Sequence, residues 1–257
     1  MPPFIDTNVY LSRWPTRRVR GDTPETLVEL LKTGGVTQAW AGSFEGLLFR
    51  DMRGVNERLA ADCRVAPELL LPFGSINPTL PDWEDDLRRC HEEHRMRGIR
   101  LHPNYHGYQL DAPVFARLLA LAAERGLIVQ LALSMEDERT QSALVRAAHV
   151  DVRPLAAIVR QVPGLKLVIV NAFRAMRVEQ TDQLVAAGNV SFDIAMLEGV
   201  GGVKRLIDQI GNLDRVLFGS YAPFFYFESS VLKLRESPLA GGQLEAIRHG
   251  NAERLLA

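Results

Sequence analysis

Two histidines lie four residues apart in a segment that is dense in polar and aromatic side chains. From His102 to Tyr108, seven residues contain two imidazoles, two phenols and one amide, and Asn104 and Tyr105 lie between His102 and His106. Histidine is the side chain best suited to proton transfer near neutral pH. The segment therefore predicts substrate binding or general acid–base chemistry by His102 and His106. The alternative is structural, with His102 hydrogen-bonded to a neighbouring loop and the tyrosines serving as packing.

A carboxylate and a guanidinium are the next candidates. Asp193 lies within the largely apolar stretch Val190–Ala195, where it ends an expected buried strand, and a buried carboxylate must be paired or face a cavity. It is our first candidate for a general base, or for a partner to Arg100. Arg100 lies two residues before His102, so on a strand both side chains point to the same face. A structural ion pair inside the fold is the competing interpretation.

The polar segment that follows residue 133 contains two further candidates. Glu136 and Arg139 come directly after an apolar stretch. The guanidinium of Arg139 could bind a substrate carboxylate through two parallel hydrogen bonds. Alternatively, Asp137 and Arg139 form an exposed ion pair in a loop, which would contribute little to stability.

The elements that must position these residues follow from the hydrophobic pattern. Eight short apolar runs without polar alternation are typical of parallel strands buried on both faces. Amphipathic helical patterns separate them, and eight strand–helix units average about 32 residues each, which suits a (β/α)8 TIM barrel in one domain over residues 1–257. An open doubly wound sheet is the alternative. In a barrel the functional side chains lie at the C-terminal ends of the strands. The expected strands cover residues 4–10, 37–43, 69–76, 98–102, 127–133, 166–172, 190–195 and 216–220.

Composition narrows the range of partners. Thirty Lys plus Arg against 31 Asp plus Glu give a net charge of −1, which provides no electrostatic basis for binding nucleic acid or an anionic membrane. The apolar runs are shorter than the ~20 residues that cross a bilayer. With two cysteines, no Cys-x-x-Cys pair and no visible secretory signal, we expect a cytoplasmic protein. A small molecule is the expected ligand, and association into a homo-oligomer stays open.

The chain resembles the amidohydrolase superfamily, in the branch of short barrels called amidohydrolase 2. The resemblance covers essentially the whole chain and implies a metal-dependent-hydrolase-like TIM barrel. Its most specific parts are the Gly-Ser-x-x-Pro element and the C-terminal stretch. The four matching motifs are residues 5–10, 98–103, 217–223 and 250–256.

The departures from the family pattern concern the metal ligands that the resemblance implies. The family usually opens with Asp-x-His-x-His. In this chain Asn8 and Tyr10 occupy the positions of those two histidines. Asn171 replaces the histidine that usually follows the sixth strand. Tyr221 replaces the aspartate of the Gly-Ser-Asp element late in the family's sequences. The fifth strand also lacks its histidine. Amide oxygens and protonated phenols are poor ligands for Zn²⁺ or Mn²⁺. We therefore expect no catalytic metal and no cofactor, and we expect these four residues to line a substrate cavity.

Three functions remain in competition. The first is a metal-independent hydrolase of a lactone, ester or amide of a small carboxylate-bearing molecule. In this hydrolase Asp193 or His102 would activate water. One of three arginines would hold the substrate carboxylate and polarise a carbonyl: Arg100, Arg139 or Arg174. The second is a non-catalytic barrel that binds a metabolite or serves as a subunit of an assembly. The third is a metal hydrolase with relocated ligands, drawn from His102, His106, Asp193 and Glu136.

Overall fold

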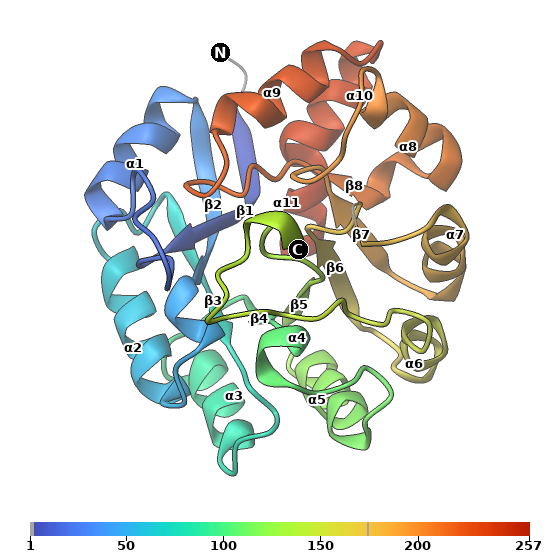
Figure 1. Cartoon of the computed structure of the whole chain (residues 1–257). Helices are drawn as coiled ribbons and strands as arrows, with labels where there is room; N and C mark the ends of the chain where they lie inside the picture. The colour runs from blue at the N-terminus through green and yellow to red at the C-terminus, as the bar shows by residue number, and fades with distance from the viewer. Residues whose placement is uncertain (1–2, 174) are drawn as a thin grey trace.

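Eight parallel strands form one sheet in the order β1 to β8, with most of the helices in a ring around it, as the computed structural model in Figure 1 shows. The structure describes residues 3–173 and 175–257. The sheet closes between its first and last strands, where the Thr7 amide donates to the Phe218 carbonyl (3.0 Å) and the Tyr10 amide donates to the Ala222 carbonyl (2.8 Å). The predicted (β/α)8 barrel is confirmed. The strands are β1 Phe4–Leu11, β2 Val36–Ser43, β3 Leu70–Ser75, β4 Gly98–Leu101, β5 Ile128–Ala132, β6 Lys166–Val170, β7 Val190–Asp193 and β8 Val216–Leu217.

The helices follow local signals in the sequence. The first begins after Thr23, whose hydroxyl accepts from the Thr26 amide, has Pro24 at its first position and ends before Gly34. The short helix α4 contains His106. The helices are α1 Pro24–Thr33, α2 Met52–Cys63, α3 Trp83–Glu92, α4 Pro103–His106, α5 Pro113–Glu124, α6 Leu155–Gln161, α7 Val178–Ala187, α8 Gly202–Ile210, α9 Phe227–Arg235, α10 Gly241–Glu245 and α11 Asn251–Leu256, with a π-helical turn at Ala246–Gly250.

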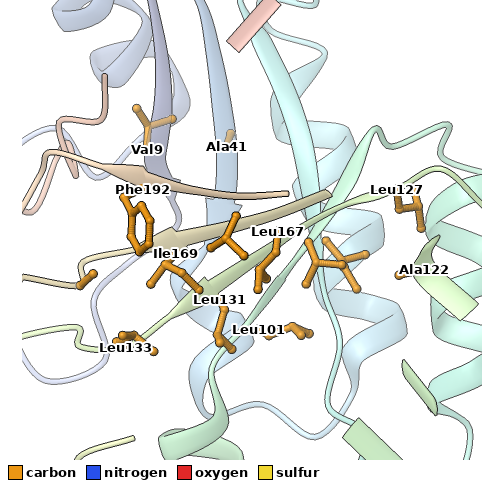
Figure 2. Packing of buried hydrophobic residues seen from close by; sticks show 14 of the residues in the cluster. Val9, Ala41, Leu101, Ala122, Leu127, Leu131, Leu133, Leu167, Ile169 and Phe192 are labelled. Atoms are coloured by element: carbon orange, nitrogen blue, oxygen red, sulfur yellow. The ribbon is translucent and has the colours of Figure 1, made fainter. Parts of the chain in front are cut away.

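Alternation along each strand divides the core into two layers. Ile99 and Leu101 pack in the outer layer between strands and helices, together with the aliphatic side chains in Figure 2. The alternate residues of this segment, Arg100 and His102, point into the barrel. The same alternation puts Gln130 inside, beside Arg100. The predicted common face of Arg100 and His102 is therefore observed.

Two further features bear on the sequence-based expectations. Cys63 and Cys90 are both buried and free of disulfides. Within the described part of the chain, no helix is long and apolar enough to cross a membrane.

Candidate functional site

Three of the predicted residues form one hydrogen-bonded group at the C-terminal ends of β1, β6 and β7. Asn8 Nδ2 donates to Asp193 Oδ2 at 2.7 Å and to Asn171 Oδ1 at 2.9 Å. The Asn171 backbone amide donates to Asp193 Oδ1 at 3.0 Å. All three side chains are fully buried, and burial raises the pKa of Asp193 to about 6. Amide donors thus surround a carboxylate that changes charge near neutral pH.

A phenol–imidazole pair lies beside this group. The Tyr10 hydroxyl is 3.0 Å from His102 Nε2, and the Tyr10 ring stacks on Phe44 with centroids 4.5 Å apart. Burial lowers the pKa of His102 well below its ordinary value, and nearby His106 and Arg100 lower it further. Burial raises the pKa of Tyr10 to about 12. The imidazole is therefore neutral and the phenol is protonated at neutral pH.

Tyr221 follows β8 and contacts the segment after β5 at the C-terminal end of the barrel, which we call its mouth. Its hydroxyl donates to the Met135 carbonyl at 2.6 Å, and burial raises the pKa of Tyr221 well above the ordinary tyrosine value. Tyr221 and Asn171 have φ angles of 61° and 58°, in the left-handed region that non-glycine residues seldom adopt. Such strain persists where the surroundings enforce it, and it is common at functional sites.

Arg100 is bound entirely within the protein. Its Nε donates to Gln130 Oε1 (2.7 Å), its Nη1 to the Val9 carbonyl (2.8 Å) and its Nη2 to the Trp40 carbonyl (3.0 Å). Its Cζ lies 4.3 Å from the centre of the Tyr10 ring. A Cβ at Gly42 would lie 2.7 Å from Nη1, so the guanidinium needs a glycine there. Arg100 is thus buried under the site with its donors on internal acceptors, rather than directed at a substrate.

The remaining predicted residues fall into different places, and Arg174 lies outside the described residues. Arg139 does not join the site: its side chain is 82% exposed and pairs with Asp137 on the same loop. His106 lies next to the site, with its Nε2 2.8 Å from the Gly46 carbonyl. Glu136 is buried at the mouth, and its Oε2 lies 3.4 Å from Arg17 Nη2.

Asp6 is a functional candidate that the sequence analysis did not select. Its Oδ1 accepts from the backbone amides of Asn8 (3.1 Å) and Ser220 (2.9 Å), and burial raises its pKa to about 7. Proximity to Asp193 raises the pKa further. The signal was available, because Asp6 lies two residues before Asn8 on the same strand.

The donor set does not fit a divalent metal. Metal binding needs lone pairs directed at one point, whereas Asn8 points N–H groups at Asp193 and Asn171. No group of three or more His, Cys, Asp or Glu side chains that could hold a metal ion occurs in residues 3–173 and 175–257. The relocated set of His102, His106, Asp193 and Glu136 is therefore not assembled either.

These features define a (β/α)8 TIM barrel with a buried group of polar side chains at the C-terminal ends of its strands. The chain belongs to the amidohydrolase family: the model of the Amidohydrolase 2 family matches residues 11–257. No curated protein matches its sequence.

Solved structures share the fold. A putative amidohydrolase from Staphylococcus aureus is 13% identical, covers 99% of both chains and gives a TM-score of 0.77. The 5-carboxyvanillate decarboxylase LigW from Sphingomonas paucimobilis is 14% identical over 100% of this chain and 99% of its own, with a TM-score of 0.74. A dihydroxybenzoic acid decarboxylase from Polaromonas with bound manganese is 15% identical over 100% and 97% of the two chains, with a TM-score of 0.74.

Proposed function

We propose that this chain is an enzyme of the amidohydrolase type that works at the C-terminal rim of its barrel without a resident metal. Its substrates are lactones, esters or amides of small carboxylate-bearing molecules. The observation that carries the proposal is the setting of Asp193, whose two oxygens accept from amide groups of Asn8 and Asn171 and whose pKa burial raises to about 6. A carboxylate with this pKa can take up and return a proton near neutral pH.

Each side chain of this site has a separate role in the proposed reaction. Asp193 accepts a proton from water as the water oxygen bonds to the substrate carbonyl carbon, and then passes that proton to the leaving oxygen or nitrogen. Tyr10 and Tyr221 stay protonated and can donate to the oxyanion. His102 is the weaker candidate base because burial lowers its pKa. We assign it to holding the Tyr10 hydroxyl.

Substrate entry requires the mouth to open. Asp193, His102 and Tyr221 are fully buried, and Tyr221 is bound to the Met135 carbonyl. The segment after β5 must therefore separate from Tyr221 before a carbonyl group reaches Asp193. Loop opening of this kind is common in enzymes that exclude water during catalysis.

The similar structures support the substrate class. Two of them are named for decarboxylation of 5-carboxyvanillate and dihydroxybenzoic acid, which are both carboxylates. We carry over the carboxylate and not the manganese. Asn8 stands where the family usually has a metal-binding histidine, and its amide directs a hydrogen-bond donor at Asp193.

Metal analysis combined with a hydrolysis screen tests the proposal. Protein purified without chelator should contain substoichiometric Zn, Mn and Fe, and turnover of lactones and esters should persist in EDTA. Asp193→Asn should reduce kcat by at least about 100-fold, the usual scale for loss of a general base. Arg53→Gln, which changes an exposed ion pair on α2, should leave kcat unchanged. Stoichiometric metal, or full activity in Asp193→Asn, would overturn the proposal.

A second function is favoured by a different observation. All six of Asn8, Tyr10, His102, Asn171, Asp193 and Tyr221 have no exposed surface. A non-catalytic barrel that binds a metabolite at its rim or serves in an assembly does not need these six side chains to be accessible. Absence of turnover, together with ligand binding at the rim that Asp193→Asn does not alter, would favour this function over catalysis.

A further inference from the structure

An ion pair joins two loops across the mouth of the barrel. Arg17 lies between β1 and α1, and Glu136 lies after β5; Arg17 Nη2 is 3.4 Å from Glu136 Oε2. The Glu136 side chain is only 3% exposed, whereas Arg17 is 45% exposed. Glu136 Oε2 has no hydrogen-bond partner in the described part of the chain, so Arg17 is its principal compensation. Arg17 can thus be reached from outside, whereas Glu136 cannot.

The same arginine contacts the aromatic cover of the site. Arg17 Cζ lies 4.9 Å from the centre of the Phe224 ring. Phe224 stacks on Tyr221 with centroids 5.0 Å apart, and the Tyr221 hydroxyl donates to the carbonyl of Met135, the neighbour of Glu136. Segments following β1, β5 and β8 therefore meet at Arg17. A change in the partner of Arg17 would act on all three.

A groove leads to this arginine from solvent. It has a volume of about 930 Å³ and lies between the segments that follow β1 and β2. Trp14, Phe44 and Phe49 contribute aromatic surface, while Arg13 and Arg17 contribute positive charge. Arg13 has no hydrogen bond or ion pair to any described residue, so its guanidinium faces solvent. The groove can accordingly accept a small ligand with an apolar body and an anionic end.

Other charges around the groove are mostly neutralised. Arg18 donates to both oxygens of Asp22, at 2.6 and 3.0 Å, and Glu45 pairs with Arg58 at 2.7 Å. Asp62 is the remaining acid in the lining, and its carboxyl is partly buried. The cations that remain for a ligand are thus Arg13 and Arg17.

We propose that Arg17 is the carboxylate-binding residue of this barrel, and that a ligand carboxylate entering the groove replaces Glu136 as its partner. A guanidinium binds a carboxylate through two parallel hydrogen bonds, which is better geometry than a single contact of 3.4 Å. Glu136 then loses its compensating charge, and a buried carboxylate without a partner is strongly disfavoured. It must leave its buried position, which separates the segment after β5 from Tyr221. The step from ligand binding to substrate entry rests on the proposed function, whereas the exchange at Arg17 does not.

Binding of benzoate, with benzamide as its uncharged counterpart, tests this exchange. Titration calorimetry and the fluorescence of Trp14, whose ring centroid is 4.7 Å from that of Phe224, report binding at the groove. Benzoate should bind and benzamide should not. Arg17→Gln should weaken benzoate binding at least about tenfold, the effect of losing one charge-assisted contact. Glu136→Gln should strengthen it about tenfold, because the internal competitor is gone. Arg53→Gln removes an exposed guanidinium that does not line the groove, and it should bind benzoate like the wild type.

The outcomes separate this inference from the proposed function. Equal binding by wild type and Arg17→Gln, or weaker binding by Glu136→Gln, would overturn the exchange. Arg17→Lys guards against a folding defect, since it keeps the charge but loses the planar fork, and should bind benzoate between wild type and Arg17→Gln. Arg17-dependent binding without any ester or lactone turnover would keep the exchange and remove the enzyme proposal. Turnover with unchanged benzoate binding in Arg17→Gln would do the reverse.

Discussion

Asn8 Nδ2 donates to Asp193 Oδ2 at 2.7 Å, across the inside of the barrel from the first strand to the seventh. The same amide group also donates to Asn171 Oδ1, so both of its hydrogens are used. Without Asn8, the buried Asp193 carboxylate would keep the Asn171 backbone amide as its hydrogen-bond donor among the described residues. The Asp193 anion is therefore stabilised by hydrogen bonds from Asn8 and Asn171, the positions where the family usually has histidine ligands.

Asn8→Ala should destabilise the protein by about 2–3 kcal/mol at neutral pH, because it removes a donor from a buried charged acceptor. Urea unfolding monitored by circular dichroism measures the change. Ser75→Ala is a matched control, since Ser75 Oγ is buried without a hydrogen-bond partner among the described residues. It should change stability little. Equal losses in the two variants would show that the Asn8 donor contributes nothing.

The sequence predicted the barrel well because its signals are local and repeated. Strand β5 (Ile128–Ala132) lies within the expected range 127–133, and β7 (Val190–Asp193) lies within the expected range 190–195. The position of Arg100 on the face of His102 followed from strand alternation alone. What the sequence could not predict was the set of partners of Arg100, because these include backbone carbonyls of β1 and β2, far away along the chain. For the same reason, the contact between Arg17 and Glu136, from loops more than a hundred residues apart, had no signal in the sequence.

Stability should fall as the pH rises from about 4 to about 7, to the extent that Asp6 contributes. Burial raises the pKa of Asp6 from 3.8 to about 7, so the folded state holds a proton that the unfolded state has released. The contribution is present below the unfolded pKa and is lost as the pH approaches 7. Asp193 acts in the same direction up to about pH 6.

Asp6→Asn keeps the oxygen that accepts from the Ser220 and Asn8 amides but removes the titration. Its free energy of unfolding should fall less steeply than that of wild type between about pH 5 and about pH 7. The difference in slope reports the titration of Asp6 together with its electrostatic coupling to Asp193. Parallel pH profiles for the two proteins would contradict a raised Asp6 pKa.

Gly42→Ala should destabilise the barrel by about 1–3 kcal/mol, the usual effect of overpacking a filled core. The new Cβ would lie 2.7 Å from Arg100 Nη1, and the guanidinium cannot move without losing the Val9 and Trp40 carbonyls. Gly242→Ala is the control: it lies in α10 with no atom within 4 Å of the added Cβ. In that helix alanine should raise stability by about 0.5–1 kcal/mol. Thermal melts should show a lower melting temperature for Gly42→Ala and a higher one for Gly242→Ala.

Tyr221→Phe should loosen the mouth without unfolding the barrel. The substitution removes the hydrogen bond of 2.6 Å to the Met135 carbonyl while keeping the ring that stacks on Phe224. Loss of one such bond costs about 1 kcal/mol, which raises the population of the open state about fivefold. Amide hydrogen exchange should therefore accelerate about fivefold in residues 133–137 and stay unchanged in β3. Tyr108→Phe is the control, because the buried Tyr108 hydroxyl has no hydrogen-bond partner among the described residues; it should leave exchange in residues 133–137 at the wild-type rate. Equal acceleration in both variants would mean that the Tyr221 hydroxyl has no special part in closing the mouth.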